Sequence, residues 1–514
     1  MEYFERSASK IYRNTIFLYL RMLFLLVISL YTSRLTLEYL GVIDFGIYNV
    51  VAGVITVLSF LSNSMALAVN RFLSFEMGTG NIAKLRDIFS ISLKIHFIIA
   101  LIVVLGGETI GLWFVNNKLV IPEDRLIAAN YIYQFSIIAF VFTVLRVPYN
   151  AAIIAHEDMK IYSYLGVVEG LLRLSVVFSL KYVLQDRLIT YGFLFALLTI
   201  GVSLYYGFHC KRKYKECSYK KTHDTKLFKE MLYYAGISTA GNLSSVVLDQ
   251  GQNILLNIFF GPVVNAARGI AYQVNSAVTA FVGSIYSAAT PQITKSFGAN
   301  DKKYLAKVVN ETTILSMIIL TVLVIPIVVN LPLLLELWLG EGNVPDSTAL
   351  FCRLILIGML LSNSCRPLLI SIQSSGNILR VHLYTGLIII ANIPIDYILL
   401  NFYHVPAHYI FIVYIISLIF FVLTILYLAK LQLNWEIKHY FFKIQLPLLI
   451  LALASLGVST LLYLFWRESL LSCFIEFLTS SVIMGVGSYV FVLPRESREQ
   501  FNNVMRKYFK QKQH

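Results

Sequence analysis

The sequence predicts an all-α integral membrane protein with about 14 transmembrane helices. Two observations concern composition: 58% of the residues are hydrophobic and only 14% are charged. A soluble chain of 514 residues does not sustain this balance, so lipid must be most of its solvent. A third observation is that apolar runs reach roughly 20 residues, enough to cross a hydrocarbon core of about 30 Å as a helix. Ranges such as 314–329 and 410–428 are apolar on every face, which excludes barrel strands with alternating faces.

Six spans are expected before a polar connector and eight after it. The first apolar run follows Arg6, Lys10 and Arg13, as in a signal peptide, but it is too long and lacks a small-residue cleavage site. We therefore expect it to be the first of six spans, at residues 14–33, 44–70, 89–115, 126–148, 162–184 and 189–209. The later spans are expected at residues 230–260, 269–291, 310–331, 350–370, 382–401, 409–430, 444–466 and 472–493.

Lysine and arginine gather in alternate loops, and this asymmetry predicts the orientation of the chain. The basic set comprises the loops around 71–86 and 295–307, the connector 211–229 and the tail 495–512. The 332–349 loop has neither residue type. Because positively charged short loops stay in the cytoplasm, we expect both termini and the connector on that side. The asymmetry explains much of the net charge of +14, so we expect membrane lipids, not nucleic acid, beside these charges.

An internal repeat predicts two lobes. A constant shift of about 220 residues aligns Gly41 with Gly261 and Gly78 with Gly298. An even number of spans separates the matched segments, so the lobes are expected to share one orientation, related by an axis along the membrane normal. The expected organisation is an N-terminal lobe at 1–210 (spans 1–6), a cytoplasmic basic linker at 211–229, a C-terminal lobe at 230–430 (spans 7–12), two extra spans at 431–493 and a basic tail at 494–514.

Motifs for catalysis and for metal binding are missing from the sequence. The five cysteines form neither a CxxC pair nor a His/Cys metal spacing, so we expect no disulfide framework and no zinc site. We find no Ser/His/Asp arrangement, no paired carboxylates and no P-loop. The chain is therefore expected to be a transporter and not an enzyme, with no catalytic residue, metal or cofactor.

One segment carries a family resemblance. Residues 242–281, NLSSVVLDQGQNILLNIFFGPVVNAARGIAYQVNSAVTAF, together with GTGN after the second span, resemble the polysaccharide repeat-unit flippases (Wzx-type, for O-antigen and capsule). These belong to the multidrug/oligosaccharidyl-lipid/polysaccharide exporter superfamily. The resemblance implies two helical bundles around a central cavity that opens alternately to each side. It also implies a bacterial inner-membrane protein that moves a polyprenyl-diphosphate-linked oligosaccharide to the outer leaflet, beside other polysaccharide assembly proteins.

Such a cargo needs a wet, cationic path, because a diphosphate cannot cross hydrocarbon unaided. The arginine fork suits a diphosphate, since it donates two hydrogen bonds at once. The candidate cavity cations are Arg21, Arg34, Arg146, Arg173, Arg268 and Arg366. For Arg34, Arg146 and Arg366 the alternative is that they snorkel to lipid headgroups from near the helix ends.

The seventh span is the most polar long helix. Its residues Asn242, Ser245, Asp249, Gln252 and Asn253 recur at a spacing of three or four residues and so share one helical stripe. We expect either a cavity wall that contacts sugar hydroxyls or hydrogen bonds between helices. Ion coupling to Na⁺ or H⁺ is expected at Asp249, with Asp44 and Asp396 as further candidates. Each of these carboxylates could instead neutralise a nearby arginine.

Three other functions compete with this hypothesis. A multidrug or cation antiporter of the same superfamily would need an acidic lumen, whereas arginine and lysine prevail among the charges expected in the membrane. A flippase for a lipid-linked peptidoglycan precursor is another alternative within the same superfamily. A membrane polysaccharide polymerase belongs to another class, and it would need a large outer loop or a carboxylate motif, neither of which we find.

Overall fold

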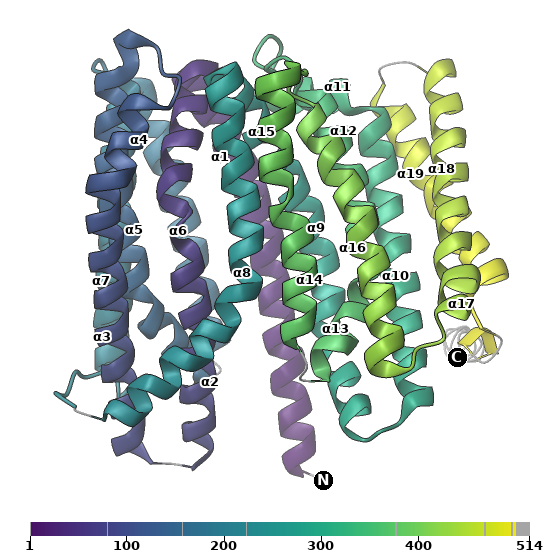
Figure 1. The fold of residues 1–514 in the computed structure, drawn as a ribbon, viewed down its shortest axis with the longest axis horizontal. Coiled ribbons are helices and arrows are strands. Elements are labelled where there is room, and N and C mark those ends of the chain that lie inside the picture. The colour runs from purple at the N-terminus through teal and green to yellow at the C-terminus, as the bar shows by residue number, and fades with distance from the viewer. Residues whose placement is uncertain are drawn as a thin grey trace, which may run out of the picture. The chain divides into compact units, whose positions relative to one another are not determined.

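The computed structural model describes the backbone of residues 2–79, 81–156, 158–222, 224–375, 378–466, 469–494 and 497–499 (Figure 1). The side chains of residues 2–21, 67, 78, 79, 237–242, 291 and 378 lie outside the described part. All regular elements in the described ranges are helical, which confirms the predicted fold class.

The first two expected spans form one helical hairpin with a glycine at its corner. Helix α1 (Glu2–Thr56) contains Gly41 at φ 79° and ψ 168°, and α2 (Ser59–Thr79) continues its second arm. This backbone conformation is open almost only to glycine, because in other residues the Cβ would be too close to the backbone of its own peptide units. In the second arm, Gly46 lies so close to Pro262 that a Cβ on Gly46 would be 1.9 Å from the Pro262 carbonyl oxygen.

Four more helical segments follow in the first half of the chain. The third contains a π-helical turn, where the Tyr133 hydroxyl donates a 2.6 Å hydrogen bond to the Gly107 carbonyl. Asp158 and Asp186 cap the helices that they precede with their side-chain oxygens. The elements are α3 (Ile82–Gly106), η1 (Gly107–Gly111), α4 (Leu112–Asn117), η2 (Glu123–Arg125), α5 (Leu126–Ala155), α6 (Met159–Ser179), η3 (Leu180–Tyr182) and α7 (Arg187–Lys213).

The structure contains the repeat that the sequence predicts at the first hairpin. Helices α8 (Thr225–Phe260) and α9 (Pro262–Gly298) meet at Gly261, whose φ of 78° and ψ of −176° nearly equal those of Gly41. The shift also relates the caps of the next helices: Asn81 caps α3 and Asp301 caps α10 (Lys302–Val329), each by accepting a backbone N–H three residues ahead. The glycine corner and the following helix cap are therefore separated by the same number of residues in both copies of the repeat.

The remaining helices include one broken pair. Helices α12 (Thr348–Asn363) and α13 (Arg366–Ser374) bend by 44° at residues 364 and 365. The Ser364 carbonyl freed by the break accepts hydrogen bonds from Tyr440 (3.2 Å) and Gln445 (3.3 Å). The other elements are α11 (Leu331–Leu339), α14 (Ile378–Ile390), α15 (Asn392–Tyr403), α16 (Tyr409–Leu433), α17 (Ile437–Tyr440), η4 (Phe441–Gln445), α18 (Leu446–Phe465), α19 (Leu470–Gly487) and η5 (Ser488–Val492).

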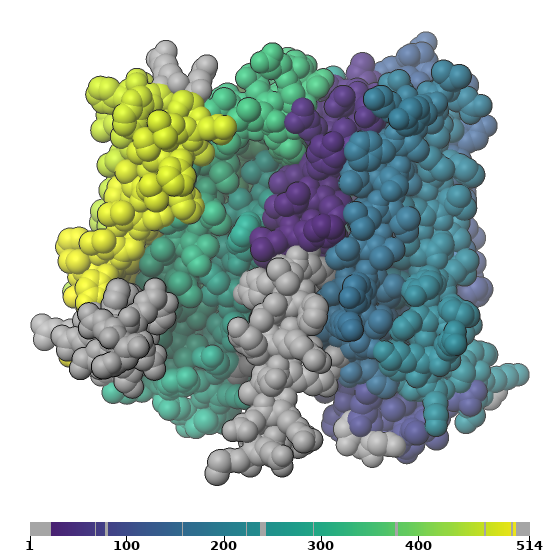
Figure 2. Space-filling model, turned by 180° about the vertical axis from the view of Figure 1, so that it is seen from behind, coloured from purple at the N-terminus to yellow at the C-terminus, as the bar shows by residue number. Residues whose placement is uncertain are grey.

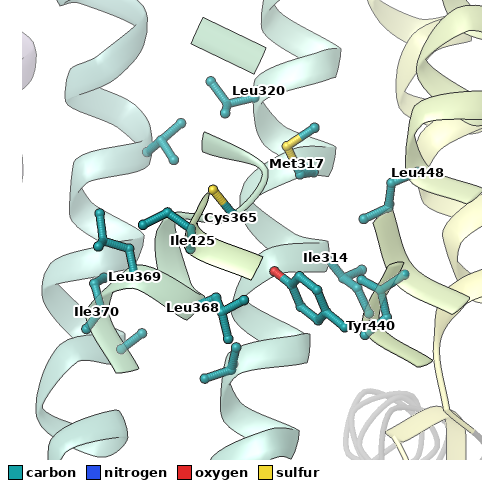
Figure 3. Packing of buried hydrophobic residues seen from close by; sticks show 14 of the residues in the cluster. Ile314, Met317, Leu320, Cys365, Leu368, Leu369, Ile370, Ile425, Tyr440 and Leu448 are labelled. Atoms are coloured by element: carbon teal, nitrogen blue, oxygen red, sulfur yellow. The ribbon is translucent and has the colours of Figure 1, made fainter. Parts of the chain in front are cut away.

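The chain forms two compact units. Unit 1 comprises Met1–Gly269, Trp338–Thr348 and Ile390–Ala407, and unit 2 comprises Ile270–Leu337, Ala349–Ile389 and His408–His514. The core of unit 2 surrounds Tyr440, which lies among Ile314, Met317 and Leu368 (Figure 3). In the same unit, α18 and α19 pack against α10 (Figure 2). The expected lobe boundaries differ from these units and stay a prediction.

Ten helical segments in the described ranges are long and apolar enough to cross a membrane, and the bent pair is an eleventh candidate. Each of the 14 expected ranges falls on a helix or on consecutive helices, but fewer pass this test. One reason is that α1 counts once although it bends at Gly41. The other is that α8 and α9 carry many polar side chains, which lower their mean hydropathy.

Candidate functional site

Arg268 is the most buried of the predicted cations whose side chains the structure describes. It lies on α9 with 5% of its side chain exposed, and its Nη2 donates to Asp249 Oδ1 (2.5 Å) and to the Asp249 carbonyl (2.6 Å). Asp249 on α8 is 40% exposed and also accepts 2.8 Å from Gln250 Nε2. The α8–α9 corner at Gly261 brings the two partners together. Asp249 therefore neutralises an arginine, which is the alternative to ion coupling that the sequence left open.

Nearer the Gly261 corner than this pair, three asparagines link α8 and α9. Asn265 Nδ2 donates to the Asn253 carbonyl (2.7 Å) and side chain (2.8 Å), and Asn257 Nδ2 donates to Asn265 Oδ1 (3.0 Å). Asn257 also accepts from the Val120 N–H (2.8 Å) in the loop after α4. All three asparagines are buried. Asn253 thus takes part in hydrogen bonds between helices, which is one of the two arrangements that the sequence left open.

Asp396 on α15 is a fully buried carboxyl group. It accepts a 2.9 Å hydrogen bond from Gln252 Nε2, and its other oxygen has no hydrogen-bond partner among the described residues. No arginine or lysine of the described chain forms an ion pair with it. A buried carboxylate is strongly disfavoured unless a proton or a cation neutralises it.

Arg146 and Arg173 share one carboxylate. Arg146 Nη1 donates to Glu169 Oε2 (3.0 Å), and Arg173 Nη2 donates to Glu169 Oε1 (2.7 Å). The Arg146 guanidinium lies 5.1 Å from the centre of the Tyr206 ring, and that of Arg173 lies 5.1 Å from the Phe195 ring. Two guanidiniums and one carboxylate leave a net charge of +1 on helices α5 and α6. The structure thus unites two of the predicted cavity cations.

Asp44 belongs to a different ion cluster at the Gly41 corner. Arg125 Nε and Nη2 contact its two oxygens at 2.7 and 2.5 Å, and Arg125 Nη1 contacts Asp186 Oδ2 at 2.5 Å. Burial raises the pKa of Asp186, but the hydrogen bonds from Arg125 and from the backbone outweigh it and lower that pKa below its usual value. This cluster joins α1, η2 and the start of α7. Asp44 therefore also neutralises an arginine.

The other predicted site residues are scattered or lie outside the described part. The side chains of Arg21 and Asn242 belong to that outside part. Ser245 is exposed on α8, and Arg34 is half-buried on α1, within 3.9 Å of the point where a Cβ on Gly340 would lie. Arg366 is exposed at the start of α13 in unit 2 and forms no ion pair with a described residue.

Four residues of these clusters were not singled out from the sequence: Glu169, Arg125, Asn257 and Asn265. Glu169 had a usable signal, because an acid four residues before Arg173 in an apolar helix predicts an ion pair on one face. The pairing of Arg125 with Asp44 had none, since 81 residues separate them.

Comparisons with known proteins agree with this architecture. The MatE family model matches residues 238–398, which is less than half of the chain. The structure "Lipid II flippase MurJ, inward closed conformation" is similar with a TM-score of 0.70 and 14% identity, over 93% of this chain and 98% of that one. A search of curated protein sequences finds no matching relative.

Two exporters of known structure are also similar. An inward-facing multidrug resistance MATE transporter of the MOP superfamily has a TM-score of 0.64 and 12% identity, over 80% of this chain and 95% of that one. A mutant of the Vibrio cholerae MATE transporter has a TM-score of 0.58 and 16% identity, over 84% of this chain and 98% of that one. At these identities the likeness establishes the fold alone. The chain is a multi-pass membrane protein with the fold of these flippases and exporters.

Proposed function

We propose that this chain is a flippase that moves a polyprenyl-diphosphate-linked oligosaccharide, an O-antigen, capsule or exopolysaccharide repeat unit, from the inner to the outer leaflet. The observation that carries the proposal is the Arg146–Glu169–Arg173 cluster, which holds a net positive charge within helices long and apolar enough to span a membrane. An arginine at the bilayer centre costs about 2.5 to 3.5 kcal/mol on insertion scales, so two neighbouring ones call for a function.

The charge of this cluster favours an anionic cargo over a cationic one. A diphosphate carries negative charge that arginine forks bind in a bidentate manner. A cation antiporter would be expected to present unpaired carboxylates, whereas Asp249, Asp44 and Glu169 are each bound by an arginine. Asp396, which has no arginine partner in the described part of the chain, is the exception. A peptidoglycan precursor is also a polyprenyl diphosphate, so it remains the main alternative cargo.

We propose Asp396 as the site of coupling to an ion gradient. It is the one predicted coupling residue that no arginine neutralises in the described part of the chain. Its unshared oxygen, at 0% exposure, lies where a proton or a Na⁺ ion would relieve the cost of the buried charge. This ranking reverses the expectation from the sequence, in which Asp249 came first.

The test is a flipping assay in proteoliposomes that contain the full-length protein. The probe is a fluorescent oligosaccharide on undecaprenyl diphosphate, and a membrane-impermeant quencher reports the leaflet. We expect protein-dependent flipping that Arg268→Ala and Arg173→Gln reduce by at least about tenfold, because each removes a charge-assisted contact. Preference for a peptidoglycan precursor would reassign the cargo, and export of an organic cation without flipping would overturn the proposal.

A further inference from the structure

The ion clusters around Arg125 and around Glu169 differ in how many N–H groups of their arginines are engaged. At Arg125, all three nitrogens donate to two carboxylates, and the cluster has a net charge of −1. Arg146 and Arg173 each use one nitrogen toward a described residue, although a guanidinium carries five N–H groups. The first arrangement suits a structural clamp, and the second leaves donors for a ligand.

From this contrast we infer that Glu169 is an exchangeable counter-ion, which occupies the two arginines in the empty state and is displaced by the phosphate oxygens of an anionic ligand. The inference rests on the proposed function, because it names how the cargo site is filled and emptied. One carboxylate spans both guanidiniums with single contacts, as a bridging phosphate would, and each guanidinium is backed by an aromatic ring.

Exchange also solves a problem of release. A pair of bare arginines in an apolar environment would be costly when empty and would hold a diphosphate too tightly when full. Glu169 lowers the cost of the empty site, because it keeps the cluster at +1. It also weakens the hold on the diphosphate, because it competes for the same N–H groups when the ligand leaves. The Glu169 side chain is 15% exposed, so it is not sealed in the packed interior of the helices. Of the two arginines, Arg173 is the more accessible, with 46% of its side chain exposed.

The experiment measures binding of farnesyl diphosphate to the purified full-length protein by calorimetry. We expect Glu169→Gln to tighten binding on the order of tenfold, because it removes the competing anion, and to slow flipping because release is slower. Glu169→Asp, which keeps the charge, should stay near the wild-type affinity. The matched control is Glu108→Gln, since Glu108 pairs with Gln134 and not with an arginine.

The outcomes separate this inference from the proposed function. If Arg146→Gln and Arg173→Gln bind farnesyl diphosphate as well as wild type does, the cluster is not a cargo site and both ideas fail here. If these variants bind weakly but Glu169→Gln does not bind more tightly, the cargo site stands and counter-ion exchange is wrong. If Glu169 had a purely structural role, Glu169→Gln would lower the unfolding temperature of the ligand-free protein and leave the affinity of the folded fraction unchanged.

Discussion

At the scale of single residues, an ionisable side chain is defined by its partners more than by its type. Arg125, Arg268 and Arg173 are all arginines near or within helices of unit 1, yet their partners leave local charges of −1, 0 and +1. Asp396 differs from Asp44 and Asp249 in having no arginine partner in the described part. These differences decide which residues are free to bind a mobile ion or an anionic group.

Asp396→Asn is the prediction at this scale. The amide cannot carry a charge, so we expect the variant to lose the acceleration of flipping by an imposed Na⁺ or proton gradient while still binding farnesyl diphosphate. The measurement is the flipping rate in proteoliposomes with and without each gradient. Asp301→Asn is the matched control, because Asp301 is an exposed helix cap that asparagine can replace. A gradient response that persists in Asp396→Asn would remove this residue from the coupling role.

At the scale of elements, two glycine corners shape unit 1. Gly41 and Gly261 have nearly the same φ and ψ, and each joins two long helical arms. The Gly261 corner sets Arg268 against Asp249 and aligns the three asparagines. The Gly41 corner lies beside the Asp44–Arg125 pair. The repeat in the sequence is therefore a repeat of corner geometry.

Gly41→Ala and Gly261→Ala should each lower the free energy of unfolding by about 1–3 kcal/mol, because alanine is strained at these backbone angles. The reason is backbone conformation and not crowding, since a Cβ on Gly41 would meet nothing within 4 Å. Thermal unfolding of the purified protein checks this. Gly106→Ala is the control, because Gly106 is helical and equally uncrowded, and it should keep or slightly raise the stability. Equal effects at all three positions would contradict the corner role.

At the scale of the whole molecule, orientation in the membrane is still a prediction from charge. In unit 1 the connector after α7 docks on the start of α3, where Arg86 Nε donates to the Ser218 carbonyl (3.1 Å). The loop after α11 lies near Arg34 on the arm of α1 that leads to Gly41. Since α2 and the second arm of α1 separate these places, the two loops mark opposite ends of the unit.

Accessible cysteines test this orientation. We expect Lys215→Cys in the connector to react with a membrane-impermeant maleimide only after cells are permeabilised, and Glu341→Cys to react in intact cells. Both positions are exposed, and four of the native cysteines are buried, so background labelling should be low. The unsubstituted protein measures that background. The reverse pattern of labelling would invert the assigned topology.

The sequence alone determined that the chain is helical and spans a membrane, because apolar runs of that length leave the backbone no other way to satisfy its hydrogen bonds. It also located the Gly41–Gly261 repeat and the polar residues of α8. It could not decide which charges cancel: Asp44 meets Arg125 from 81 positions away, and Gln252 meets Asp396 from 144. Such pairs depend on how helices pack, and local spacing holds no record of that. Tertiary structure therefore assigned the roles, leaving Asp396 without an arginine and placing Glu169 between two.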